Sequence, residues 1–252
     1  MNIHLVSFGT TSNYGGALTR VKIQASQWQD QGQAVFKSVN VFDEKVLQRD
    51  HQDFCNDHAN FINSNPRGFG YWLWKSYLIG HVMSRVPDDD LVLWMDAGCQ
   101  LNFRALPRFR EYCKLAQQHG ALCFDVGMPE SMWTKGDTAR RIAGDSVEHM
   151  NSGQLIGTIS LWRNDPFNRQ LVREWYNIGM EDGYRYITDV PSVAPNSAEF
   201  REHRHDQSII SLLIKKHGRY LALPDGTYFA NWHQDGEHMP IWATRNPTSI
   251  FV

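Results

Sequence analysis

The run LVLWM at residues 91–95 constrains the fold of this chain more than any other stretch. It is short and apolar at every position, so it predicts a strand buried on both faces, as in parallel sheets covered by helices. Residues 3–8 predict a second buried strand, and residues 17–32 and 34–42 predict a helix followed by a strand. Strand, helix and strand in that order predict a parallel sheet with a right-handed crossover.

The rest of the chain continues this pattern without repeats, low-complexity segments or a linker. Residues 128–153 form a polar stretch too long for an ordinary connector, which predicts a functional loop with some helix. A second polar stretch, residues 189–204, precedes a helix that Asp206 is expected to cap. The other expected elements are helices over 71–86, 108–120, 166–180 and 205–218, and strands over 91–96, 121–127 and 154–165. We predict one α/β domain over residues 1–252, with a mostly parallel central sheet flanked by helices.

Composition argues against several classes of function. The formal net charge is −2 and there is no polybasic run, so a nucleic-acid partner bound through its phosphates is not expected. The longest apolar runs fall far short of the roughly 20 residues of a membrane-spanning helix, and the first residues lack the pattern of a secretory signal. The four cysteines form no CxxC pair, which favours free thiols in a reducing compartment. We expect a soluble, cytoplasmic protein.

The strand over residues 91–96 ends on a carboxylate, Asp96, followed by the small residues Ala97 and Gly98. Ligands of open parallel sheets bind beyond the carboxyl ends of the strands. A carboxylate there holds a divalent cation or a ribose hydroxyl, and two small residues let a ligand approach the backbone. The alternative is that Asp96 caps a turn or the next helix, and this stretch alone leaves both open.

Four segments, in their order and spacing, resemble a family of small bacterial and viral glycosyltransferases with the GT-A (nucleotide-diphospho-sugar transferase) fold. They are RGFGYWLWKSYLI, DLVLWMDAGC, GTISLWRND and HRHDQSIISLL. The resemblance implies a Rossmann-like domain that passes a sugar from a nucleotide-diphospho-sugar, with UDP-sugar favoured, to an acceptor hydroxyl on a glycan or cell-surface polysaccharide. It implies a nucleotide-binding part over about residues 1–125 and an acceptor- and sugar-binding part over about 126–252.

The same resemblance implies a divalent cation, Mn²⁺ or Mg²⁺, and this sequence departs from it. The family's Asp-x-Asp motif corresponds to Asp96, Ala97 and Gly98, so the second acid is missing. Asp96 with diphosphate oxygens and waters would still bind a cation weakly. A histidine of the C-terminal tail often completes such a site in related families, and His233 and His238 are the candidates.

Basic and small residues give a candidate donor site. Arg67 and Lys75 flank the turn formed by residues 68–70, where cations would stabilise the charge of a departing diphosphate. The alternative for Lys75 is an ordinary surface lysine. Ser7, Gly9 and Thr10 end and follow the first strand, which is where this fold seats the nucleoside.

Asp206, with Asp96, is our candidate catalytic carboxylate, because the resemblance puts an acid at this position near the sugar. It would deprotonate the acceptor or bind a sugar hydroxyl, with His205 and Gln207 beside it. A zinc site formed with His203 lacks a third spaced ligand. Further candidate sugar contacts, chosen by position alone, are Trp133, Lys135, Asp137, Asn151 and Ser152.

Two other functions stay open from the sequence. A sugar-phosphate nucleotidyltransferase shares the core fold, but its glycine-rich loop with an arginine has only a distant counterpart in residues 9–20. A non-catalytic carbohydrate-binding module is suggested by the nine tryptophans, because aromatic rings make good sugar platforms.

Overall fold

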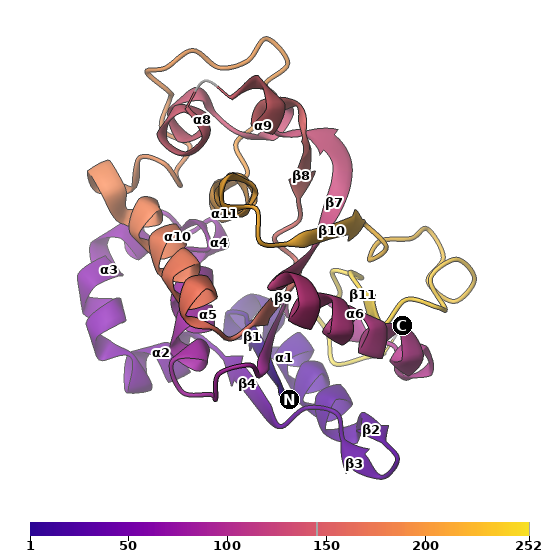
Figure 1. The fold of residues 1–252 in the computed structure, drawn as a ribbon. Helices are drawn as coiled ribbons and strands as arrows, with labels where there is room; N and C mark the ends of the chain where they lie inside the picture. The colour runs from indigo at the N-terminus through magenta and orange to yellow at the C-terminus, as the bar shows by residue number, and fades with distance from the viewer. Residues whose placement is uncertain (145, 252) are drawn as a thin grey trace.

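The computed structural model describes residues 1–144 and 146–251 and is built on a mixed central sheet (Figure 1). The strands lie in the order β10 (Leu221–Pro224), β7 (Ala121–Pro129), β9 (Ile159–Arg163), β5 (Leu91–Met95), β1 (Ile3–Phe8) and β4 (Ser38–Phe42), with β8 (Gly153–Leu155) paired to β7. β1 runs parallel to β4 and β5, and β10 runs parallel to β7. β9 is antiparallel to β5 and β7. The predicted α/β fold with a mostly parallel sheet is confirmed.

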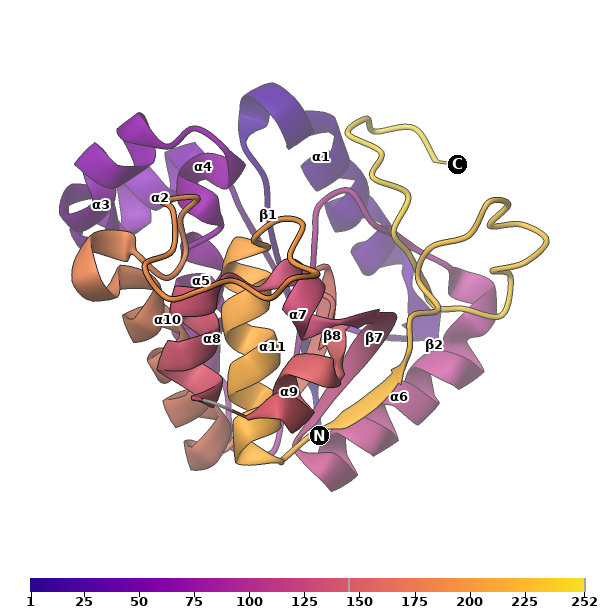
Figure 2. The same cartoon turned by 90° about the horizontal axis from the view of Figure 1, so that it is seen from above.

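Helices cover both faces of this sheet (Figures 1 and 2). On one face lie α5 (Trp74–Met83), α10 (Pro166–Tyr184) and α11 (His205–His217), and on the other lie α1 (Thr11–Gln27) and α6 (Leu106–His119). Alternate side chains of the central strands enter the two layers. Val6 and Trp94 pack with the first group of helices, and Leu5 and Leu93 pack with the second. All five residues of β5 are buried, as the LVLWM run predicts.

Smaller elements complete the chain. The predicted polar stretch 128–153 does contain helix, and the tail adds one short strand to a turn after β5. These elements are α2 (Glu44–Asp50), α3 (Gln52–Ser64), α4 (Gly68–Tyr71), α7 (Glu130–Trp133), α8 (Gly136–Ala143), α9 (Val147–Asn151), the 3₁₀ turn Phe103–Ala105, the hairpin of β2 (Gln29–Asp30) and β3 (Gln33–Ala34), and the antiparallel pair of β6 (Gln100–Leu101) and β11 (Ile241–Trp242).

Several expected element boundaries are wrong. α1 begins at Thr11 rather than at residue 17, because the Glu44 carboxylate accepts hydrogen bonds from the Thr11 N–H, at 2.8 Å, and hydroxyl. The strand expected over 34–42 is divided between β3 and β4. The strand expected over 154–165 breaks at Gly157, whose backbone N–H and carbonyl bind side chains of other elements.

The four cysteines are free thiols, and three of them are buried. Among the helices of the described residues, none has the length and apolar character needed to cross a lipid bilayer.

Candidate active site

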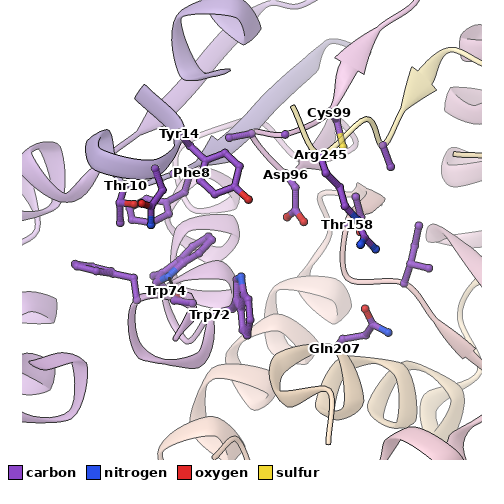
Figure 3. A pocket seen from close by; sticks show the side chains of 18 of the residues that line it. Phe8, Thr10, Tyr14, Trp72, Trp74, Asp96, Cys99, Thr158, Gln207 and Arg245 are labelled. Carbon is purple, nitrogen blue, oxygen red and sulfur yellow. Dashed lines mark hydrogen bonds between the residues drawn. The ribbon is translucent and has the colours of Figure 1, made fainter. Parts of the chain in front are cut away.

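A pocket of about 710 Å³ opens at the carboxyl ends of β1 and β5 (Figure 3). Asp96 follows β5 directly, and its side chain is 36% exposed within this pocket. The aromatic rings of Tyr14, Trp72 and Trp74 lie on one side of the carboxylate and Arg245 on the other (Figure 3). Other lining residues include Phe8, Gly9, Thr10, Ala97, Gly98, Arg204, Gln207, Asp225 and Tyr228. Ligands of open α/β sheets bind in this position.

One wall of the pocket is a left-handed turn. The φ angles from Gly68 to Trp72 are +60°, +53°, +83°, +50° and +61° in chain order. Phe69, Tyr71 and Trp72 are not glycines, and this conformation costs roughly 1–2 kcal/mol for each such residue. The turn delays the start of the helix expected over residues 71–86, because α5 begins only at Trp74. It presents Phe69 and Trp72 to the pocket.

Lys75, Asp96 and Asp206 form a charged cluster at the edge of the pocket; Asp96 lines the pocket, whereas Lys75 and Asp206 lie behind it, outside the lining. The Lys75 Nζ lies 3.0 Å from Asp206 Oδ2 and 3.5 Å from Asp96 Oδ1, and it donates to the Gly157 carbonyl at 2.9 Å. The Lys75 and Asp206 side chains are only 4% and 6% exposed. Lys75 is therefore buried, and the alternative of an ordinary surface lysine is wrong.

Burial and charge compete within this cluster. Burial raises the pKa of Asp206 to about 6, although the charge of Lys75 opposes the rise. Burial also raises the pKa of Asp96, again against the attraction of Lys75. For Lys75, burial alone would lower the pKa, but the two carboxylates outweigh it and the pKa is raised. Lys75 therefore carries its charge at neutral pH, where most of Asp206 is ionised.

The start of α11 joins this cluster to the pocket. The predicted cap at Asp206 is wrong, because the N-cap position is Arg204 and Asp206 lies within the first turn, with its carboxylate facing Lys75. The Gln207 side chain lines the pocket, and its oxygen accepts from the Gly157 N–H at 2.9 Å. His205 is buried under the rings of the left-handed turn, and its Nδ1 lies 2.8 Å from the Ile187 carbonyl oxygen.

The predicted donor residues lie in different surroundings. Gly9 and Thr10 line the pocket. Ser7 is fully buried within β1, and its hydroxyl has no hydrogen-bond partner among the described residues. Arg67 is half-exposed and forms an ion pair with Asp189 at 3.1 Å, outside the set of residues that lines the pocket.

Lys135 and Asp137 lie outside the pocket lining and hold the polar stretch after α10 in place. The Lys135 Nζ donates to three carbonyls, including Thr188 at 2.8 Å and Val190 at 3.1 Å. The Asp137 carboxylate pairs with Arg185 at 2.8 Å and accepts from the backbone N–H groups of residues 193 and 194. In this structure Lys135 and Asp137 therefore hold the backbone of the stretch after α10.

Trp133, Asn151 and Ser152 also lie outside the pocket lining. Trp133 is buried, and the Arg204 guanidinium lies 3.8 Å from its ring centroid. Asn151 ends α9 with an exposed side chain, and the Ser152 hydroxyl donates to the His149 carbonyl at 2.6 Å.

Residues 241–249, which we call the C-terminal strap, run alongside α1 and reach the pocket (Figure 2). Buried Arg20 of α1 donates to the carbonyls of Asn246, at 2.9 Å, and Thr248. The same guanidinium donates to the carbonyls of Ala97 and Cys99, both at 3.2 Å. Arg20 therefore ties the strap to the turn that carries Asp96.

Several lining residues escaped the sequence analysis, among them Tyr14, Arg204, Asp225 and Arg245. Arg245 lies in a tail whose sequence has no periodic pattern. Its place beside the pocket follows only from the contact of this tail with Gly98 in the folded chain. A side chain at Gly98 would put a Cβ 3.0 Å from the Arg245 Cα. Gly98 therefore lines the pocket through its backbone, as expected, while the strap backbone occupies the direction that a side chain at Gly98 would take.

The residues around Asp96 do not fit a divalent cation held by the protein. Asp96 is already paired with Lys75, and residues 1–144 and 146–251 contain no group of three His, Cys, Asp or Glu side chains arranged to hold a metal. His233 and His238 are exposed and lie outside the pocket lining. Asp225 does line the pocket, but its Oδ1 accepts hydrogen bonds from Thr227.

Solved structures with the same fold include two glycosyltransferases. Mouse xyloside xylosyltransferase 1 has a TM-score of 0.52 and 12% identity, with 99% of this chain and 100% of that chain covered. A glycosyltransferase involved in the glycosylation of the major capsid of PBCV-1 has a TM-score of 0.56 and 9% identity, with 96% and 92% covered. Neither the protein-family models nor the curated proteins contain a match. The chain has the GT-A fold of these glycosyltransferases.

Proposed function

We propose that this protein is a glycosyltransferase that moves a sugar from a nucleotide-diphospho-sugar, with UDP-sugar favoured, to an acceptor hydroxyl. The observation that carries this proposal is the Asp96 carboxylate inside a pocket of about 710 Å³ at the carboxyl edge of the sheet, between aromatic rings and Arg245. The volume lies within the range of about 300–1,000 Å³ that ligand pockets occupy. The two structural neighbours add support at the level of the fold alone.

The proposed reaction breaks the bond between the anomeric carbon and the diphosphate oxygen and forms a bond to the acceptor oxygen. Asp96 binds the ribose, and cations beside it stabilise the charge that grows on the diphosphate. Aromatic faces such as those of Trp72 and Tyr14 pack against rings of the substrates. The acceptor proton passes to a carboxylate, for which Asp206 is our candidate because it lies beside the pocket, 3.0 Å from the Lys75 Nζ, although it is not among the residues that line it.

The first experiment is a thermal-shift screen of UDP-, GDP-, ADP- and CDP-sugars, since a ligand that binds the folded state raises its stability with concentration. The donor that gives the largest shift is then used to measure nucleoside diphosphate release, with glycan acceptors, for the wild type, Asp96→Asn and Asp206→Asn. We expect each substitution to lower turnover at least tenfold. Asp50→Asn, which changes an exposed carboxylate, is the matched control.

If Asp96→Asn and Asp206→Asn both turn over as fast as the wild type, the proposed assignment of the active site is wrong. Pyrophosphate release from a nucleoside triphosphate and a sugar phosphate would favour a nucleotidyltransferase instead. Glycan binding with no response to any nucleotide would favour a carbohydrate-binding module.

A further inference from the structure

The place where a second motif carboxylate would stand is occupied by the strap. A Cβ built on Gly98 would lie 3.0 Å from the Cα and 3.3 Å from the carbonyl carbon of Arg245. The Gly98 carbonyl accepts from the Asn246 N–H at 3.2 Å and from the Thr244 hydroxyl at 2.9 Å. An acidic side chain at position 98 would therefore have to displace the strap. The glycine at this position is what allows the strap to pack here.

The strap is firmly held in this position. β11 pairs with β6 directly after the Asp96 turn, and the Ala17 N–H donates to the Pro247 carbonyl at 2.9 Å. Arg20 is fully buried and bonds carbonyls of both the strap and the turn. Removing a buried donor of this kind would leave these carbonyls without a partner, which destabilises the folded chain. The strap is thus a built part of the pocket.

Arg245 brings an available positive charge to this place. Its side chain lines the pocket and points to the same space as the Asp96 carboxylate (Figure 3). Its guanidinium lies 6.0 Å from the Tyr228 ring centroid and takes part in none of the ion pairs found among the described residues. Its backbone has φ +53°, a conformation that an arginine adopts at a cost and that concentrates at functional sites. Arg204, the residue before α11, lines the same pocket, and its Nε also lies 3.5 Å from the Glu202 carboxylate.

We propose that Arg245, assisted by Arg204, binds the donor diphosphate in place of a divalent cation, so that donor binding needs no metal. This inference rests on the proposed transferase function and specifies its donor site. A guanidinium presents paired N–H donors that match two phosphate oxygens and keeps its charge at every physiological pH. The guanidinium stabilises the departing diphosphate as a divalent metal ion would, and it needs no second carboxylate at position 98.

The test is calorimetry with UDP and with uridine, in EDTA and in Mn²⁺, on the wild type, Arg245→Gln and Arg49→Gln. GDP, ADP and CDP with their nucleosides are used in the same way. We expect the wild type to bind its preferred nucleoside diphosphate with the same affinity in EDTA and in Mn²⁺. Arg245→Gln should lower the affinity for that diphosphate at least tenfold and leave the affinity for the nucleoside unchanged. Arg49→Gln, at an exposed ion pair on α2, should behave as the wild type.

Two results would overturn this inference while the transferase function stands: loss of diphosphate binding in EDTA with recovery in Mn²⁺, or unchanged diphosphate binding by Arg245→Gln. If none of the four diphosphates binds under either condition, the proposed function fails and this inference fails with it.

Discussion

Gly98→Ala is the most direct perturbation of the contact between the Asp96 turn and the strap. The added methyl group would lie 3.0 Å from the Arg245 Cα, 3.3 Å from its carbonyl carbon and 3.6 Å from the Tyr14 ring. Overpacking of this kind costs about 1–3 kcal/mol. If displacement of the strap absorbs that whole cost, affinity for a ligand that needs the strap in place falls roughly 5- to 150-fold.

Two measurements check this expectation: the free energy of unfolding from urea titration, and UDP affinity from calorimetry. Gly15→Ala is the matched control, because Gly15 lies in α1 and its nearest neighbour to an added Cβ is the Thr11 Cβ at 4.0 Å. The control should gain up to about 1 kcal/mol from its better helix propensity. The reasoning is refuted if Gly98→Ala unfolds within about 0.5 kcal/mol of the wild type, the range of neutral surface changes, and binds UDP equally well.

Three further predictions concern the side chains of Arg20, Lys75 and His81. Arg20→Met should speed hydrogen exchange of residues 241–249 while β1 stays protected; equal exchange rates in the strap would count against its anchoring role. Lys75→Met should lower the free energy of unfolding by about 3–5 kcal/mol, because two carboxylates lose their partner. Adding Asp206→Asn should recover part of that loss in urea unfolding. If the effects of the two substitutions on the unfolding free energy are simply additive, the two side chains are not coupled. Burial, and to a smaller extent the charges of His51 and Arg85, lower the pKa of His81 from 6.5 to about 4, so between these two pH values the unfolded state binds the proton and most of the native state does not. Between pH 7 and pH 4 the wild type should lose about 3 kcal/mol more unfolding free energy than His81→Gln, and parallel stability curves would exclude this.

The main layers of the fold were predictable because burial leaves a direct mark on sequence. A strand buried on both faces must be apolar throughout, and LVLWM is. The helix at residues 205–217 likewise carries a long apolar face that a packed layer requires. The transferase fold was predictable from the order of four segments, although no single motif specifies it.

Side-chain direction in the polar stretches could not be predicted from position. Lys135 and Asp137 look like ligand-binding residues in a loop, yet both point to backbone groups of residues 185–194. Arg67 and Lys75 flank the same turn, but Arg67 is half-exposed and Lys75 is buried. These differences depend on contacts between residues distant in the chain, which a local pattern does not contain. Arg245 is the clearest case, because its neighbours Gly98 and Asp96 are more than a hundred positions away.

The left-handed turn from Gly68 to Trp72 has a consequence for the order of folding. Its three non-glycine residues oppose the turn by about 3–6 kcal/mol in total, so the isolated segment does not adopt it. Contacts made by neighbouring elements must supply that energy, such as the Trp74 indole N–H that donates to the Gly68 carbonyl at 2.9 Å. We expect this wall to acquire protection from hydrogen exchange late in refolding, after β1 and β5, so the nascent chain would complete its core before it could recognise a substrate.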